Sequence, residues 1–267
     1  MKRLLLPACA LLVVLIASTL VGQPPRAEEA RGRVVKVEIP TERGVKLEGV
    51  LHSPAKPNGV VVVFGSGRGY HMDLPLLVRS AEELQARGVT ALRFNWAYFT
   101  AKGKYSEGLA TELKDLDAAL AYAKGLDGIK HVILAGKSLG SIAAFMRATA
   151  KSGDLAGLIL MTFPIHPPGK PAEIFDDQKK LFSWSKPLMI VCGDADPYSA
   201  LKSLYTYCAG FEQAPRLVLA PGDHSFNGAD RKNAEETAKN VDLAAHGLAR
   251  WVAIWSETLT TGPSDED

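Results

Sequence analysis

The sequence predicts an α/β fold: a mainly parallel, twisted sheet of about eight strands, with helices on both faces and an antiparallel hairpin at the N-terminal edge. Short β-branched runs alternate with segments of helical periodicity, which is the order of repeated strand–helix–strand units. Most of these runs are continuously apolar, which is typical of strands buried on both faces. The 267 residues, 47% of them hydrophobic, suffice for one sizeable domain.

The first elements of the domain are a hairpin and a buried strand. VVKVEIP and VKLEGVLHSP alternate in polarity on either side of a Glu-Arg-Gly turn within residues 33–52. The run VVVVF at 60–64 is a strand that ends in a glycine-rich turn. Residues 74–87 have helical spacing and stop at Gly88.

The alternation continues to the end of the domain. We predict further strands at 89–94, 132–135, 155–163, 187–192 and 216–219. We predict further helices at 111–124, 139–150, 200–211 and 234–259. Residues 164–184 form a looser segment with at most one short helix, so any lid over a site would be minimal. The domain is therefore expected to span 33–259, followed by a polar tail at 260–267.

The N-terminal segment is a separate unit. Met1-Lys2-Arg3 is positively charged, 4–21 is almost wholly apolar, and small residues follow before the first acidic residues. This pattern predicts an export signal over 1–27 and a periplasmic or extracellular protein. The alternative is membrane attachment through an uncleaved anchor at 4–21, because about 18 apolar residues nearly span a bilayer.

Charge and cysteine content exclude several classes of protein. The net charge is +2 and no long basic block occurs, so we expect no nucleic-acid partner. Without residues 1–27, 28 basic and 29 acidic residues remain, a net charge of −1. That part has two cysteines, Cys192 and Cys208, which allow one bridge or two core thiols but no disulfide framework. Neither has metal-ligand spacing.

A serine lies between glycines where a predicted strand becomes a helix. In Gly-Lys-Ser-Leu-Gly, residues 136–140, this context is that of a nucleophile elbow, in which a tight turn presents the hydroxyl above the sheet. Ser138 is therefore the candidate nucleophile. The alternative is an ordinary turn serine that caps a helix.

A serine nucleophile needs a base, and the base needs a carboxylate that orients it. The strand at 187–192 ends in Gly-Asp-Ala-Asp-Pro, and the strand at 216–219 leads to Pro-Gly-Asp-His-Ser-Phe. Both follow the carboxyl ends of strands, where open α/β sheets place their sites. His224 is the candidate base, and Asp194 and Asp196 are the candidate acids.

With these residues in this order, the sequence resembles an α/β-hydrolase across residues 33–258. The resemblance implies Asp196 as the acid, because Gly193-x-x-Asp196 is similar to the family's acid motif. A narrower resemblance rests on GSGRGYHMD at 65–73, LRFNW at 92–96, GKSLG and GDHSF. These segments look like a branch that holds dienelactone-hydrolase-like bacterial proteins and the hydrolase-fold subunit of the animal NSL chromatin complex.

The resemblance also implies an oxyanion hole made by two backbone N–H groups, those of Leu139 and Ser66. Phe64-Gly65-Ser66-Gly67 stands where relatives often have His-Gly-x-Gly, so a phenylalanine replaces the usual histidine. The alternatives for this loop are an anion-binding nest around Arg68 or a plain glycine turn.

The predicted reaction is hydrolysis of a small or soluble carboxylic ester through an acyl-enzyme, which requires neither a metal nor an organic cofactor. A minimal lid favours small-molecule esters over long lipids. The residues expected to line the pocket are Arg68, His71, Trp96, Tyr98, His166 and Phe226, although ordinary packing also accounts for the aromatic ones.

Two other functions fit the same sequence. A non-catalytic binding or scaffold protein could use this fold, because a fold does not fix a function. A thioester or C–C bond hydrolase could use the same three side chains. The sequence does not decide the oligomeric state.

Overall fold

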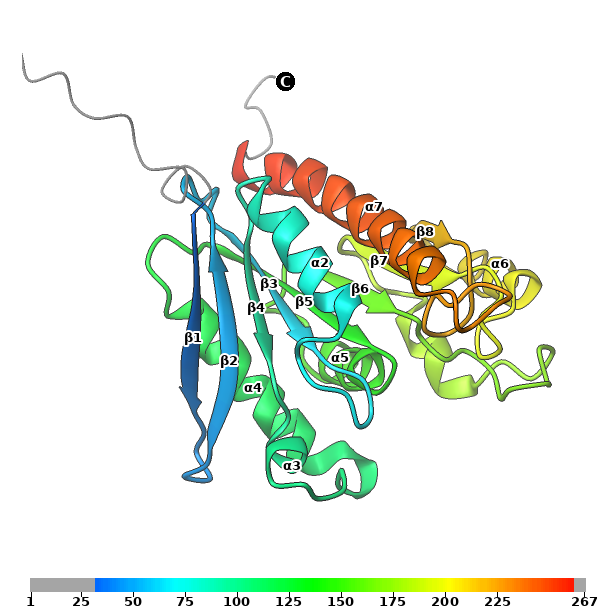
Figure 1. Cartoon of the computed structure of the whole chain (residues 1–267), viewed down its shortest axis with the longest axis horizontal. Coiled ribbons are helices and arrows are strands. Elements are labelled where there is room, and N and C mark those ends of the chain that lie inside the picture. Colours follow the sequence, from blue (N-terminus) through cyan, green and yellow to red (C-terminus); the bar gives the residue numbers. More distant parts are fainter. Residues whose placement is uncertain (1–31, 262–267) are drawn as a thin grey trace, which may run out of the picture.

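The structure, a computed structural model, describes residues 32–261. The segment predicted as a signal or anchor, 1–27, lies outside the described residues, as does most of the predicted polar tail. One eight-stranded sheet runs through the molecule in the order β1-β2-β4-β3-β5-β6-β7-β8 (Figure 1). The strands are β1 (Arg33–Pro40), β2 (Lys46–Ser53), β3 (Val60–Gly65), β4 (Thr90–Phe94), β5 (His131–Lys137), β6 (Gly157–Met161), β7 (Leu188–Gly193) and β8 (Arg216–Ala220).

The predicted N-terminal hairpin forms the edge of this sheet. β1 and β2 pair antiparallel, with Arg33 opposite Ser53, and β2 continues antiparallel onto β4. From β4 to β8 all strand pairs are parallel. The central strands β3, β5, β6 and β7 are buried along almost their whole length, which explains their continuous apolar runs.

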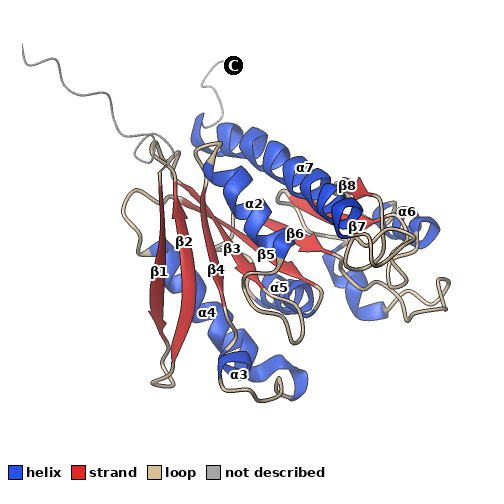
Figure 2. Ribbon diagram, in the orientation of Figure 1, coloured by secondary structure: helices blue, strands red, loops and turns tan. Residues whose placement is uncertain are grey.

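Helices cover both faces of the sheet (Figure 2). On one face, α2 (Pro75–Gln85) and α7 (Ala234–Thr261) lie side by side and share an apolar core with the sheet. On the other face, α4 (Ala110–Lys124), α5 (Leu139–Ala150) and α6 (Leu201–Cys208) share a second core. The shorter elements are α3 (Ala97–Thr100) and the 3-10 helices η1 (Glu107–Leu109) and η2 (Asp176–Leu181).

The predicted fold class is confirmed, with small differences in the elements. α3 was not predicted from the sequence, and α7 extends to Thr261, two residues beyond the predicted end of this helix. Within the described residues, the segment between β6 and β7 contains one helix, η2, which agrees with the predicted minimal lid. Cys192 and Cys208 are both free thiols. None of the helices within residues 32–261 has the length and apolar character needed to cross a bilayer.

Candidate active site

Ser138 occupies the single residue between β5 and α5. Its backbone has φ 54° and ψ −113°, a conformation that costs a non-glycine residue free energy. The flanking glycines make this turn possible, because a Cβ on Gly136 would clash with the backbone of Gly140, and a Cβ on Gly140 would clash with the backbone of Gly65. The strand-to-helix junction therefore approaches its neighbours as closely as a nucleophile elbow does.

Three side chains from separate loops form one hydrogen-bonded chain. Ser138 Oγ lies 2.9 Å from His224 Nε2, and His224 Nδ1 lies 2.9 Å from Asp196 Oδ2. With Nδ1 donating to the carboxylate, Nε2 is free to accept the serine proton. The Tyr198 ring packs against the His224 ring, with 4.8 Å between the centroids.

The two candidate acids have different partners. Asp196 is 2% exposed, and its second oxygen, Oδ1, accepts a hydrogen bond from Tyr198 N. Asp194 instead accepts a hydrogen bond from Gly222 N and closes the turn beside β8. Only Asp196 is therefore placed to orient the imidazole.

The sheet order explains why these residues meet. β5, β7 and β8 are parallel, so their carboxyl ends lie at one edge of the sheet. The loop that carries His224 is stiffened by Asp223, whose carboxylate accepts hydrogen bonds from Ser225 N, Asn227 N and Arg231 Nε. These contacts, which outweigh the effect of burial, lower the pKa of Asp223.

The loop after β3 packs on the elbow. Ser66 is fully buried, and its carbonyl oxygen accepts a hydrogen bond of 2.9 Å from Trp96 Nε1. Among the backbone hydrogen bonds that the described residues form outside the regular elements, none is donated by the N–H of Ser66 or Leu139. Both N–H groups therefore remain available to an acceptor near Ser138.

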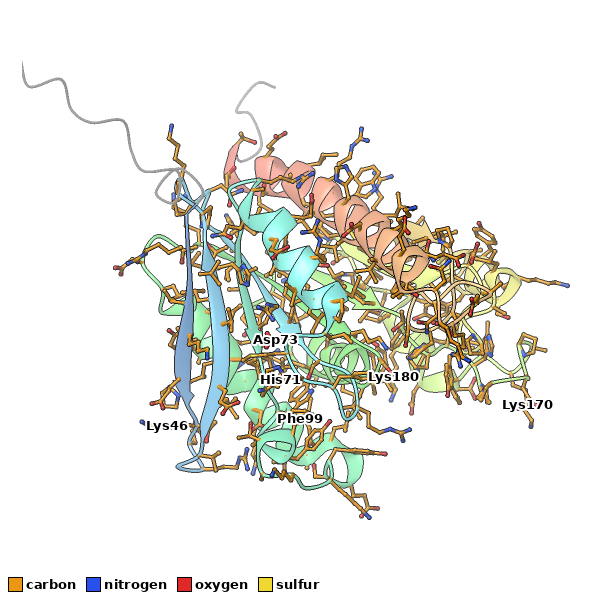
Figure 3. The ribbon with its side chains drawn as sticks, in the orientation of Figure 1. Lys46, His71, Asp73, Phe99, Lys170 and Lys180 are labelled. Atoms are coloured by element: carbon orange, nitrogen blue, oxygen red, sulfur yellow. The ribbon has the colours of Figure 1, made fainter. Side chains whose placement is uncertain are left out.

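Two buried polar residues, Arg93 at the end of β4 and Asn95 directly after it, hold the far end of this loop. The sequence motif LRFNW includes both residues but did not indicate this role. Arg93 donates to Met72 O at 2.5 Å and to Asp73 Oδ1 at 2.7 Å. Asn95 Oδ1 accepts from Met72 N. The hydrogen bond from Arg93 lowers the pKa of Asp73, which Figure 3 shows close to His71.

Two of the predicted pocket residues are core residues instead, which corrects the prediction. Trp96 is completely buried, packs edge-on against Phe94 and is held by its bond to Ser66 O. His166 is 1% exposed, accepts a hydrogen bond from Ala200 N through Nε2 and lies with Nδ1 2.8 Å from Pro167 O. Neither side chain has surface left for a ligand.

The other predicted pocket residues divide between two cavities and the surface. His71 and Tyr98 line a cavity of about 500 Å³ beside the loop after β3, with Phe99 at its wall. Figure 3 shows His71 next to Phe99, and the two rings lie edge to face. Phe226 is 1% exposed and belongs to the apolar core beneath α7, and it also borders a different cavity, of about 370 Å³, between α2 and α7. Arg68 is exposed.

A metal centre has no support in the described part of the chain, where no group of three or more His, Cys, Asp or Glu side chains could hold an ion.

Solved structures share this fold across most of the chain. Est1E from Butyrivibrio proteoclasticus, solved with ferulic acid bound, is 18% identical over 83% of this chain and 100% of its own, with a TM-score of 0.64. An α/β serine hydrolase homologue from Coxiella burnetii is 19% identical over 80% and 97%, with a TM-score of 0.64. An α/β serine hydrolase without a lid from Xanthomonas campestris is 21% identical over 82% and 95%, with a TM-score of 0.60.

No curated protein matches the chain. The family model described as "Alpha/beta hydrolase domain" matches residues 58–253, well over half of the chain. That match begins just before β3 and ends within α7, so it contains Ser138, Asp196 and His224. The narrower resemblance, to dienelactone-hydrolase-like proteins and the NSL-complex subunit, stays a prediction. The chain therefore belongs to the α/β-hydrolase family.

Proposed function

We propose that the protein is a serine hydrolase that cleaves a small or soluble carboxylic ester through an acyl-enzyme. The observation that carries the proposal is the pair of 2.9 Å hydrogen bonds that links Ser138 Oγ to His224 and His224 to Asp196. A binding protein has no need of a serine in a strained conformation with a histidine on its hydroxyl, whereas a nucleophile needs both.

The proposed reaction has two halves. His224 Nε2 takes the proton of Ser138 as Oγ attacks the ester carbonyl, and then gives it to the leaving alcohol. A water molecule attacks the acyl-enzyme in the same way and releases the acid. Asp196 keeps the proton of the neutral imidazole on Nδ1 and stabilises the imidazolium that forms at each attack.

The oxyanion of each tetrahedral intermediate would accept hydrogen bonds from Leu139 N and Ser66 N. The close packing of Gly65 on Gly140 supports this assignment, because it brings the two backbone segments together at the elbow. Removing one such donor typically costs about 100- to 1,000-fold in kcat.

The substrate is proposed to be small or soluble because the segment between β6 and β7 is short. Ser138 and His224 are only partly buried, so a substrate can approach them without a lid having to open. The solved relatives fit this reading: one has ferulic acid bound, and another is described as lacking a lid.

Hydrolysis of p-nitrophenyl esters from acetate to decanoate, by wild type and by Ser138→Ala, tests the proposal. We expect the substitution to lower kcat by about 10⁴-fold or more, and the wild type to prefer short chains. The control is Ser152→Ala, an exposed serine that should leave the rate unchanged. Equal rates in wild type and Ser138→Ala would exclude Ser138 as the nucleophile. A wild type that cleaves thioesters but not esters would favour the thioester alternative.

We also propose that the protein is exported, on the strength of the charged start, apolar run and small residues within 1–27. Sequencing the N-terminus of the secreted or periplasmic protein tests this. A mature chain that begins near residue 28 is expected, and an intact N-terminus in the membrane fraction would favour the anchor at 4–21.

A further inference from the structure

A cavity of about 370 Å³ lies on the α2–α7 face of the sheet and is lined by the residues next to Ser138 and His224 in the chain. We call it the Lys137 cavity. Its walls come from the start of α2, the end of β5, the loop after His224 and the start of α7. They are formed by Leu74, Pro75, Leu76, Lys137, Ser225, Phe226, Asn227, Arg231, Lys232, Ala234, Thr237, Ala238 and Val241. This volume suits a short apolar chain or a single ring.

Two residues that line the cavity are the chain neighbours of Ser138 and His224. Lys137 directly precedes Ser138, and Ser225 directly follows His224. The alternation of β5 explains where the lysine points: Ile133 and Ala135 pack in the core beneath α2 and α7, so Lys137 continues the same row. Lys137 therefore lines the cavity from the α2–α7 side of the elbow, while the serine hydroxyl faces His224.

Lys137 is an unusual residue to find there because it is 2% exposed. Among the described residues its ammonium forms no salt bridge and no hydrogen bond, and it lies over the face of the Tyr70 ring, 5.2 Å from the centroid. Burial lowers the pKa of Lys137 to about 8, although Asp196 and Asp223 act through space in the opposite direction. An ammonium that is largely removed from water and has no counter-ion is costly unless a ligand supplies one.

The electrostatics of the cavity favour an anion with a single charge. Three cationic side chains line it and no carboxylate does. Arg231 already pairs with Asp223, and Lys232 is exposed, which leaves Lys137 as the buried cation without a partner. The start of α2, which no side chain caps, adds the partial positive charge of a helix N-terminus. The remaining lining is mostly apolar.

We propose that the Lys137 cavity is the subsite for an apolar arm of the ester substrate that ends in a carboxylate, and that Lys137 Nζ pairs with this carboxylate. The proposal rests on the proposed function, because it makes the cavity part of the site around Ser138. It names the substrate class as esters that carry a free carboxylate on a short carbon chain, in either the acyl or the alcohol half.

Two pairs of esters with nearly identical shapes test the proposal. The acyl pair is p-nitrophenyl hydrogen glutarate and p-nitrophenyl 5-methylhexanoate, in which a carboxylate replaces an isopropyl group. The alcohol pair is the acetate esters of 5-hydroxypentanoate and 5-methylhexan-1-ol. In one of the two pairs we expect wild type to favour the carboxylate ester in kcat/KM by about tenfold or more, the strength of a charge-assisted hydrogen bond.

In each variant, the quantity measured is the ratio of the kcat/KM values for the two esters of a pair. A general loss of activity lowers both values and leaves this ratio unchanged. Lys137→Met, which keeps the length of the side chain and removes its charge, is expected to abolish the preference, and Lys137→Arg to keep part of it. The matched control is Lys36→Met, an exposed lysine of the edge strand β1, which should keep the full preference. A wild type without preference in either pair, or a preference that survives Lys137→Met, would overturn the proposal.

A separate binding measurement distinguishes failure of the subsite from failure of the proposed function. If wild type cleaves none of these esters, calorimetry with hexanoate and hexanamide tests the cavity alone. Binding of hexanoate but not hexanamide, lost in Lys137→Met and kept in Lys36→Met, would support the subsite without the chemistry. Equal binding of the acid and the amide would reject it.

Discussion

Asp194 and Asp196 follow the same strand, yet they have different hydrogen-bond partners. Asp196 is buried beneath His224 and bonds to Nδ1, whereas Asp194 closes a turn through Gly222 N. From the sequence, both residues were candidates for the acid that orients His224, and only the resemblance to the family's acid motif favoured Asp196. The structure supplies the physical distinction, because a carboxylate can orient the imidazole only from within hydrogen-bond distance.

Replacing each aspartate with asparagine turns this distinction into a measurement. Asp196→Asn should lower kcat on p-nitrophenyl acetate by about 10³- to 10⁴-fold, because an amide cannot stabilise the imidazolium. Asp194→Asn is the matched control and should stay within about threefold of wild type, since the amide oxygen can still accept from Gly222 N. A larger loss in Asp194→Asn than in Asp196→Asn would reverse the assignment.

His52 is expected to make the stability of the folded protein depend on pH. It is 2% exposed, and burial, together with the neighbouring Arg93, lowers its pKa to about 4. The unfolded chain binds this proton near pH 6.5, so the native state loses stability as the pH falls from about 6.5 to about 4. The full loss is about 3 kcal/mol, which follows from the size of the pKa difference.

Urea unfolding at pH 7, 5.5 and 4 checks this expectation. The free energy of unfolding of wild type should fall further than that of His52→Gln, which has no proton to bind and whose amide oxygen can still accept from Arg93. Equal losses of unfolding free energy in the two proteins would contradict this expectation. They would show that the folded and unfolded chains bind a proton at His52 equally well.

Sequence motifs selected residues that meet in space where the motif fixes the backbone geometry, but they did not give the side-chain direction where burial decides it. The elbow and the two strand-end loops identified Ser138, Asp196 and His224, which lie in one hydrogen-bonded chain. Trp96 and His166 also follow strands, but both side chains turn into the core. Loop position alone does not give side-chain direction, and aromatic residues suit pockets and cores equally well.

At the scale of elements, the elbow depends on two glycines that leave no room for a side chain. A Cβ at position 140 would overlap the carbonyl groups of Gly65 and Ser66 at the end of β3. Because backbone occupies that space on both sides, the clash cannot be relieved by rotating a side chain. α5 would have to move away from the sheet and take Ser138 with it.

Gly140→Ala is therefore expected to destabilise the fold by about 3 kcal/mol or more and to remove activity, as overpacking of a rigid core does. Gly153→Ala is the matched control, because open space surrounds that position and its φ is not in the left-handed region. Melting temperature and ester hydrolysis report the two effects. A Gly140→Ala protein with wild-type stability and activity would show that the close approach is absent in solution.

Element boundaries were predictable from sequence where apolar periodicity was strong. The hairpin, β3 and α5 were placed within a residue or two, and α5 was placed at Leu139–Ala150. α3 was missed because its four residues, Ala97–Thr100, are too few to give a periodic signal, and none of their side chains is fully buried. The pairing of β3 with both β4 and β5 is a long-range property that local patterns do not carry.

At the scale of the whole molecule, α7 closes one face of the sheet. This 28-residue helix packs its buried side against α2 and the sheet, as Figure 1 shows. Leu248 lies in that core with no exposed surface, whereas Leu243 on the same helix is 59% exposed. The helix therefore offers two identical side chains in opposite environments.

Leu248→Ala should lower the free energy of unfolding by about 2 to 5 kcal/mol, because it leaves a cavity beneath α7. Leu243→Ala, which makes the same change of helix propensity, should alter it by less than about 0.5 kcal/mol. Urea midpoints at constant m-value measure both. Similar losses in the two variants would mean that α7 does not pack with the face that the structure assigns to it.

The fold class followed from the sequence because alternating strands and helices permit few architectures. The order β2-β4-β3-β5 places the loops after β3 and β5 next to one another at the edge where β7 and β8 also end. A site at that edge was expected from the general rule for open α/β sheets. The Lys137 cavity was not expected from the sequence, because it depends on how α2 and α7 pack over the end of β5.

The central claim is that Ser138 is a nucleophile activated by His224, and covalent labelling tests it most directly. Wild type and Ser152→Ala are treated with a fluorophosphonate beside Ser138→Ala, and each intact protein is weighed by mass spectrometry. We predict one phosphonyl adduct on wild type and on Ser152→Ala, and none on Ser138→Ala. An adduct of equal yield on Ser138→Ala, or no adduct on folded wild type, would contradict it.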